Sequence, residues 1–267
     1  MTASAESFQL SNEAAEMYEE AFVPAFFAQW ATILVDAARV APGQTVLDVA
    51  CGTGIVARTA ADLVRPDGVV VGLDLNPAML AVARRVRPDI EWREGAAEAL
   101  PFEDRSFDAV LCQMALMFFR DRAAAAREMA RVVTDRGIVA VAVPGRVDRQ
   151  PAFAPFFDVA ARHAGAEAMS LLGAYFVCGD MDELAGLLES AGLAIASRRT
   201  PLGTYRAPSV DALVTTEVES TPLVERISAD VYRRIREDAH EALRPFTRPD
   251  GSVEAPFESN IVTAHRR

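Results

Sequence analysis

The chain contains no lysine: the lysine and arginine positions, 27 in total, are all arginine. Without lysine there is no Schiff base, which excludes the usual pyridoxal enzymes, and no Gly-Lys-Ser/Thr phosphate loop. Basic residues are also outnumbered: 38 acidic residues against 27 basic ones give a formal net charge of -11. A long-range positive field that would attract nucleic acid is therefore not expected. The composition predicts a protein with no nucleic-acid partner.

Cysteines and long apolar runs are also few. The three cysteines, Cys51, Cys112 and Cys178, are widely separated and show no metal-ligand spacing, which predicts a reduced, cytoplasmic protein without a metal site. The first ten residues have no basic and apolar leader pattern. The longest uncharged stretch, residues 21–35, contains Pro24 and is too short to span a bilayer. No membrane span is expected.

About half of the 267 residues are apolar, which is enough for one sizeable core. Between residues 41 and 145, short apolar runs alternate with amphipathic helical patterns, and this alternation predicts a parallel, doubly wound α/β sheet. The runs 68–75 and 137–143 are almost continuously apolar, as expected of strands covered on both faces. Further strands are predicted near 193–206 and 258–266.

The stretch "VLDVACGTGIV", residues 46–56, is a strand that ends in a glycine turn before a helix. Gly52 and Gly54 allow a ligand to approach the backbone, and the helix start offers free N–H donors. Asp74 stands 22 residues after Gly52, at the predicted tip of the second strand. Its carboxylate can accept hydrogen bonds from both ribose hydroxyls, each contributing roughly 1.5–3 kcal/mol. The pattern predicts an adenosine-containing cofactor.

Asp48 discriminates between cofactors of this kind. An acid directly before the glycines repels a pyrophosphate but suits an ammonium or a sulfonium group, which favours S-adenosylmethionine over NAD(P). The alternative of an NAD(P)-dependent oxidoreductase is weakened further because a chain without lysine has no Tyr-x-x-x-Lys pair.

Four segments resemble the successive motifs of class I S-adenosylmethionine-dependent methyltransferases: "VLDVACGTG", "VVGLDLNPAML", "EGAAEALPFEDRSFDAVLC" and "REMARVVTDRGIVAVAV". The resemblance is to the type 11 group, which includes ubiquinone/menaquinone-biosynthesis-like enzymes, and it is strong over residues 40–145. It implies a Rossmann-like sheet of seven strands with a reversed last hairpin. The implied reaction is in-line methyl transfer from S-adenosylmethionine to a small apolar or aromatic molecule, leaving S-adenosylhomocysteine. A non-catalytic S-adenosylmethionine-binding protein is the other alternative.

The resemblance also implies which residues hold the cofactor. Asp48, Ala50, Gly52 and Gly54 would bind its methionine end, Asp74 its ribose, Leu75 and Met79 its adenine ring, Ala96 and Ala97 the adenine amino group, and Gln113 would lie beside the sulfonium and the acceptor. The family often has Gly-Asp where this chain has Gly95-Ala96. Backbone carbonyls near Ala97, or the Glu98 carboxylate, would have to replace that aspartate.

The acceptor side has less specific candidates. Tyr18, Trp30, Phe118 and Phe119 are the candidate pocket residues, and His163, His240 and Tyr18 are the candidate general bases. For the amino-terminal aromatics, an amphipathic helix that covers the sheet is an equal alternative, and the histidines also suit a solvated surface. The acceptor, its methylated atom and the oligomeric state are left open.

The predicted organisation is one domain in three parts. Residues 1–40 form a helical lid, 41–145 form the S-adenosylmethionine-binding α/β core, and 146–267 complete the sheet. Helical insertions near 150–178 and 208–246 are expected to cover the substrate.

Overall fold

The structure, a computed structural model, describes residues 11–219 and 221–267, and these divide into two compact units. The first unit comprises the described residues up to Val143, together with Met181–Thr200 and Asn260–Arg267. The second comprises Pro144–Asp180 and Pro201–Ser259. The predicted division at residues 40 and 145 remains a prediction.

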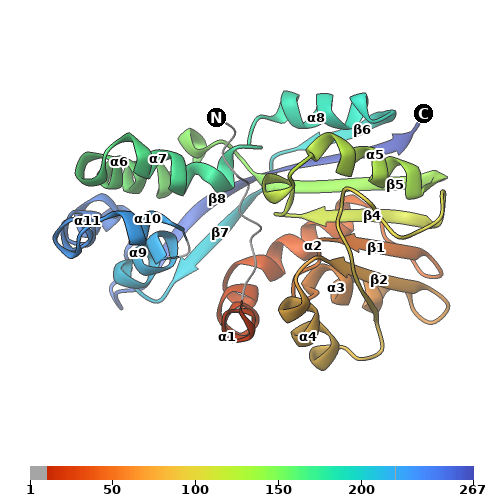
Figure 1. The fold of residues 1–267 in the computed structure, drawn as a ribbon, viewed down its shortest axis with the longest axis horizontal. Helices are drawn as coiled ribbons and strands as arrows, with labels where there is room; N and C mark the ends of the chain where they lie inside the picture. Colours follow the sequence, from red (N-terminus) through yellow and green to blue (C-terminus); the bar gives the residue numbers. More distant parts are fainter. Residues whose placement is uncertain (1–10, 220) are drawn as a thin grey trace. The chain divides into compact units, whose positions relative to one another are not determined.

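The strands form a mixed sheet in the order β3-β2-β1-β4-β5-β8-β6, with β7 paired to β8 (Figure 1). Pairs among β1 to β5 are parallel, whereas β6 and β7 both run antiparallel to β8. The predicted doubly wound sheet with reversed last strands is confirmed. The strand bounds are β1 Thr45–Val49, β2 Val69–Asp74, β3 Glu91–Glu94, β4 Phe107–Gln113, β5 Val133–Pro144, β6 Leu193–Arg199, β7 Leu202–Ala207 and β8 Val253–Arg266.

Helices cover the strands of the first unit because the strands are apolar on both faces. One cluster joins Val46 and Ala109 of the sheet to Val56 of the helix that follows β1, and it also includes residues of α2 (Ala28–Ala37) and α4. The intervening residues Leu47 and Val110 point to the opposite face and are fully buried. On that face α5 packs against β4 and α8. The helix bounds here are α3 Ile55–Val64, α4 Pro77–Val86, α5 Arg122–Val132 and α8 Met181–Ser190.

The start of α4 follows its sequence signal. The Asn76 side chain accepts hydrogen bonds from the Ala78 N–H at 2.9 Å and the Met79 N–H at 3.4 Å, and Pro77 occupies the first helical position. Asparagine supplies the missing acceptor for free helix N–H groups, and proline has no N–H to satisfy. A second local signal follows the carboxyl-terminal end of α8, where Gly192 has a φ of 91°, as expected of a glycine after a helix.

The described part of the amino-terminal segment is helical but changes its winding, and residues 1–10 of the predicted 1–40 lid lie outside the described residues. The described part consists of α1 (Asn12–Met17), a π-helix η1 (Tyr18–Phe27) and α2. Pro24 lies inside η1, where its missing N–H cannot complete an ordinary α-helical ladder. π-Helical segments are rare and are often found at functional sites.

The second unit is built mainly from helices around an aromatic core. Helices α6 and α9 each pack against α11, and α9 also packs against β7. Its core includes the fully buried rings Phe156 and Phe157.

Across the described residues, no helix combines the length and apolarity needed to cross a membrane. The remaining bounds are η2 Leu116–Phe118, η3 Val147–Arg149, α6 Phe153–Ala164, α7 Ala166–Leu172, η4 Gly173–Phe176, α9 Val210–Glu219, α10 Leu223–Arg226, α11 Ala229–Ala242 and η5 Arg244–Phe246.

Two strand predictions need correction. The segment 193–206, predicted as one strand, forms two: β6 ends at Arg199 and β7 begins at Leu202. Pro201 lies between them, and its lack of an N–H donor interrupts the ladder. The last strand, predicted for 258–266, begins at Val253. The first half of β8 pairs with β7 and the second half with β6, so the sheet has one strand more than predicted.

Candidate functional site

The glycine turn joins β1 to α3 in an unusual backbone conformation. Ala50, Gly52 and Gly54 have φ values of 56°, 55° and 91°, a region that costs an alanine roughly 1–2 kcal/mol. Gly54 is the N-cap of α3 and has no side chain to accept a hydrogen bond. Asp48, 1% exposed, accepts one instead from the Ala57 N–H at 2.9 Å. The buried carboxyl thus caps the helix and stabilises the turn.

Asp74 lies at the end of β2, beside this turn. One of its carboxylate oxygens accepts a hydrogen bond from the Gly52 N–H at 2.8 Å, and the other accepts one from the Asn76 N–H, also at 2.8 Å. The spacing of 22 residues therefore does bring Asp74 to the glycine turn. Each carboxylate oxygen has a second lone pair, so Asp74 keeps the capacity to accept a hydrogen bond from a ligand.

The two carboxyl groups share an environment that disfavours negative charge. Burial, and secondly the nearby Asp74, raise the pKa of Asp48 to about 8, while the Ala57 N–H and Arg58 oppose this rise. Burial also raises the pKa of Asp74, opposed by the N–H groups of Asn76 and Gly52. A cation placed here would relieve the unfavourable charge state of both groups.

Trp92 of β3 fills the space behind the glycines, a role that the sequence did not predict. A Cβ atom on Gly54 would lie 2.2 Å from the Trp92 ring, and one on Gly72 of β2 would lie 2.4 Å from it. The Trp92 indole N–H donates to the Arg87 carbonyl at 2.9 Å, which fixes the ring. The absence of side chains at Gly54 and Gly72 is therefore required for packing.

The amino-terminal segment contacts the turn through an ion pair. Arg58 of α3 lies 2.9 Å from Glu19 of η1, and their side chains are only 11% and 16% exposed. The Arg58 guanidinium also donates to the Thr53 carbonyl at 3.2 Å. A Cβ atom on Gly52 would lie 3.9 Å from the Tyr18 ring, so that ring is next to the turn. Nothing in the spacing of Glu19 and Arg58 indicated this pair.

Gln113 ends β4 and reaches the same segment. Its side-chain N–H donates to the Phe27 carbonyl at 3.3 Å, while its side-chain oxygen is buried without a hydrogen-bond partner in the described part of the chain. Such an unpaired acceptor costs about 1–3 kcal/mol, and a ligand donor would satisfy it. After β4, Phe118 is 38% exposed and Phe119 is half-buried.

The predicted adenine contacts differ in their surroundings. The Leu75 residue is 50% exposed, which leaves its apolar side chain free to cover a flat ring. Met79 is 8% exposed and belongs to a small apolar cluster that includes Val82 and Tyr18. Met79 therefore packs in the core of this face.

The loop that follows β3 contains the predicted contacts to the adenine amino group. Ala97 is buried, and the Ala96 carbonyl accepts a hydrogen bond from the Ala99 N–H at 3.2 Å. The Glu98 carboxylate accepts one from the Arg120 N–H at 2.9 Å. Glu98 is thus engaged in holding the loop after η2.

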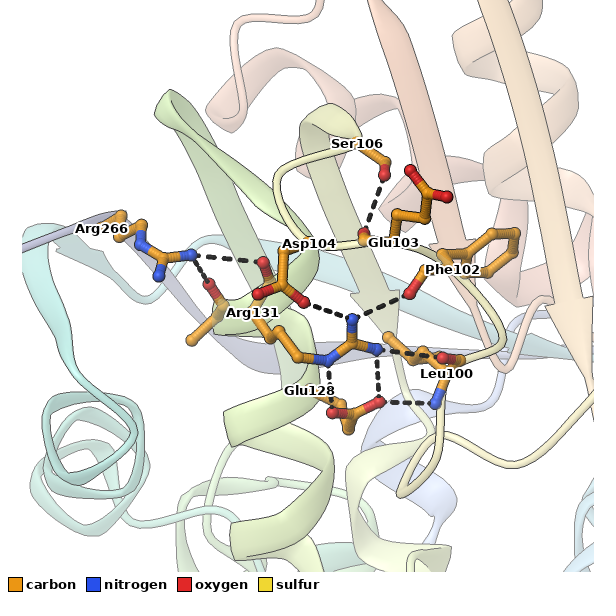
Figure 2. A network of polar contacts seen from close by, with 9 residues as sticks. Leu100, Phe102, Glu103, Asp104, Ser106, Glu128, Arg131 and Arg266 are labelled. Atoms are coloured by element: carbon orange, nitrogen blue, oxygen red, sulfur yellow. Dashed lines mark hydrogen bonds and ion pairs between the residues drawn. The ribbon is translucent and has the colours of Figure 1, made fainter.

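Arg131 of α5 fixes the far end of this loop (Figure 2). Its guanidinium donates to the Phe102 carbonyl at 2.8 Å and to the Leu100 carbonyl at 3.0 Å. Glu128 pairs with Arg131 at 2.7 Å and accepts a hydrogen bond from the Leu100 N–H at 2.7 Å. The hydrogen bond from Arg131 is the main cause of a lowered pKa of Glu128. The network gives a loop without regular structure a defined position.

The acceptor-side candidates divide between the units. Tyr18 lies next to the glycine turn, whereas Trp30 is fully buried, as expected if its helix covers the sheet. His163 and His240 belong to the second unit. The His163 imidazole lies 2.8 Å from Asp238 and that of His240 lies 3.3 Å from Asp211. The structure thus groups Tyr18 with the cofactor candidates of the first unit, and the histidine roles remain predictions.

Comparison with known proteins shows that the segment containing the glycine turn and Asp74 is similar to methyltransferases. Residues 47–141 match the model of a family described as "Methyltransferase domain". A demethylmenaquinone methyltransferase of Renibacterium salmoninarum is 42% identical over 132 residues, which are 49% of this chain and 52% of that protein. The ubiquinone/menaquinone biosynthesis C-methyltransferase UbiE of Hahella chejuensis is 40% identical over 114 residues, or 40% of this chain and 46% of its own.

The fold is also found among solved structures. A putative methyltransferase from Bacillus halodurans superposes with a TM-score of 0.61 at 20% identity, covering 88% of this chain and 98% of that one. The chain spans about half the length of the curated relatives that it matches. Over residues 47–141, the chain is therefore similar to a methyltransferase domain, as the four sequence motifs indicated.

Proposed function

We propose that this protein transfers a methyl group from S-adenosylmethionine to a small, apolar or aromatic acceptor of a quinone-like kind. The observation that carries the proposal is the hydrogen bond between the Gly52 N–H and the Asp74 carboxylate, 2.8 Å long. It joins the glycine turn and the strand-tip acid in one site. The names of the relatives, which are quinone-biosynthesis methyltransferases, support the acceptor class.

The residues present suit S-adenosylmethionine, which supplies a methyl group on a positively charged sulfur when it is bound. Asp74 can accept a hydrogen bond from a ribose hydroxyl, and the exposed Leu75 offers an apolar surface for adenine. The Asp48 carboxyl would balance positive charge near the turn. The buried, unpaired oxygen of Gln113 would accept a hydrogen bond from a donor at the end of β4. Ala50, Gly54, Met79, Ala96 and Ala97 remain proposed members of the site.

The main task of these residues is to align the methyl acceptor with the cofactor. A sulfonium-bound methyl group is already reactive, so the protein has to orient the acceptor and exclude water, which corresponds to effective molarities of roughly 10⁵–10⁸ M. We propose that the helices before residue 40 act as a lid for this purpose. The partly buried Glu19–Arg58 ion pair and the Gln113–Phe27 hydrogen bond hold these helices next to the glycine turn. Acceptor recognition is assigned to Phe118 and Phe119.

The cellular setting is part of the same proposal. Cys51, Cys112 and Cys178 are all buried as thiols, which suits a reducing compartment, and we propose the cytoplasm. We propose a small-molecule methyl acceptor as the partner, and no nucleic acid.

Cofactor identity can be tested by calorimetry with S-adenosylhomocysteine and NADH in parallel. We expect S-adenosylhomocysteine to bind and NADH not to bind. Methyl transfer from labelled S-adenosylmethionine would then be measured over a panel of quinols, phenols and amines. Binding of NADH alone would overturn the proposal, and binding of the sulfur compound without transfer to any acceptor would indicate a sensor.

Cofactor affinity is expected to rise with pH. Because the Asp48 pKa is about 8, this group is protonated at pH 6 and must lose its proton to pair with a cation. The dissociation constant for S-adenosylmethionine should therefore fall by up to about tenfold per pH unit between pH 6 and pH 8, and level off above that range. Calorimetry in phosphate and in Tris buffers should show release of up to one proton at pH 6.5.

The free energy of unfolding of the protein without ligand should fall as pH rises, whereas cofactor affinity should increase. The folded-state pKa of Asp48 lies above the unfolded value of 3.8, so the stabilisation is complete below pH 4 and is lost as pH rises through 8. Asp48→Asn, which cannot ionise, should remove the Asp48 contribution to both pH trends. Proton release that is unchanged in Asp48→Asn would show that another group titrates.

A further inference from the structure

A groove of about 510 Å³ lies between α2 and α3 on the surface of the first unit. It is lined by residues of α2, of the turn after α2 and of α3. Its apolar part includes Val40, which packs against the core, and Leu63 of α3, which is 46% exposed. An exposed apolar side chain beside such a groove gains free energy when a second surface covers it.

Asp36 and Arg39 add one charge of each sign to the lining of the groove. Both residues are exposed, and neither forms an ion pair with any residue of 11–219 or 221–267. An acid and a base three residues apart on a helix commonly pair with each other. Arg39, however, lies beyond the end of α2 and has a φ of 52°, so its side chain does not follow the helical spacing. Both charges remain available to a partner.

Arg39 also occupies a backbone position that favours glycine. Its N–H donates to the Asp36 carbonyl at 2.9 Å, and the Val40 N–H donates to the Val35 carbonyl at 3.2 Å. These two bonds form the motif that ends a helix with a left-handed residue, usually glycine. An arginine is less favourable there, and such strain is kept where the side chain has a function. The guanidinium beside the groove is the candidate for that function.

The two charges are complementary to a second copy of the same surface. In a dimer with a two-fold axis, each contact between two different residues occurs twice, once in each direction. An axis that passes between Asp36 and Arg39 places Asp36 of each copy opposite Arg39 of the other. The chain has a net charge of -11, so two copies repel each other at most orientations, whereas this patch carries equal charges of both signs.

We propose that the groove between α2 and α3 is the contact surface of a symmetric dimer of this chain. Two reciprocal Asp36–Arg39 ion pairs set the orientation of the copies, and Leu63 of each copy is buried against the apolar part of the other groove. The inference goes beyond the proposed function, because it depends on neither the cofactor nor the methyl acceptor.

Sedimentation velocity of the full chain tests the association directly. Between about 5 and 500 µM, a range that reveals micromolar dissociation constants, the average mass should rise toward twice the monomer value. Asp36→Arg leaves two positive charges on each patch, and Arg39→Asp leaves two negative charges. Either variant should weaken the association at least about tenfold, because like charges then face each other.

Reversing both charges restores the match and separates this arrangement from a general effect of mutation. The double variant Asp36→Arg, Arg39→Asp should return to within about threefold of the wild-type dissociation constant, because each acid again faces a base. A mixture of the two single variants should also associate more tightly than either variant alone. Circular dichroism of each variant checks that it is folded.

Arg127→Asp is the matched control. Arg127 is exposed on α5 of the same unit and does not line the groove, so its reversal should change the dissociation constant less than about twofold. A wild-type chain that stays monomeric over the whole range would overturn the inference and leave the groove to a different partner. Association that persists unchanged in folded Asp36→Arg and Arg39→Asp would also overturn it, because the copies would then meet through another surface.

Discussion

Asp74→Ala is expected to weaken S-adenosylhomocysteine binding by at least about 100-fold. The substitution removes a carboxylate acceptor for the ribose, and a hydrogen bond to a charged group is worth roughly 1.5–3 kcal/mol. It also releases the Gly52 and Asn76 N–H groups, which Asp74 binds at 2.8 Å, so the glycine turn loses part of its fixed geometry. Isothermal titration calorimetry of the purified variant measures the change directly.

Asp67→Ala provides the control for this experiment. Asp67 precedes the start of β2, at the opposite end of the strand from Asp74, and is exposed. Its replacement removes the same charge without touching the glycine turn, and affinity should stay within about twofold. A change of less than fivefold in Asp74→Ala, with the protein folded, would remove the residue from the site.

Gly72→Ala is expected to lower the free energy of unfolding by about 3 kcal/mol, the upper part of the range for overpacked cores. The added Cβ would lie 2.4 Å from the Trp92 ring and 3.1 Å from the Cys51 sulfur. Because Trp92 is held by its hydrogen bond to the Arg87 carbonyl, the ring cannot move away without losing that bond. Urea unfolding followed by circular dichroism would measure the loss.

Two further variants separate this clash from a general glycine effect. Gly186 lies inside α8 with nothing within 4 Å of its missing Cβ, so Gly186→Ala should stabilise the protein by roughly 0.5–1 kcal/mol. In a Trp92→Leu background, Gly72→Ala should cost less than about 1 kcal/mol, because the ring atoms are gone. Equal costs in the two backgrounds would rule out the ring as the cause.

Much of the fold could be predicted because its signals are local. Asn76 and Pro77 start α4 through contacts within one turn of helix, and Gly192 follows α8 with a positive φ. The break at Pro201 and the early start of β8 were missed because they depend on which strand lies alongside. Hydrophobic pattern indicates that a segment is extended but does not identify its neighbour.

The site was predictable to the extent that it follows from one motif. Asp48, Gly52 and Asp74 converge because a strand, a turn and the next strand tip are related by a fixed topology. The Glu19–Arg58 ion pair has no such signal, since an isolated glutamate in a helical pattern is indistinguishable from a solvated one. The packing of Trp92 against Gly54 and Gly72 also has no sequence signal, because it depends on the three-dimensional fold.

The position of β8 has a consequence for how the polypeptide reaches its native state during translation. This strand, Val253–Arg266, is inserted between β5 and β6, although every other strand is synthesised earlier. Until β8 has left the ribosome, β5 and β6 lack the strand that lies between them, and their unpaired edges can associate with other chains. Contacts that span such long sequence separations form late, so the nascent chain would depend on chaperones longer than a protein whose sheet closes in order.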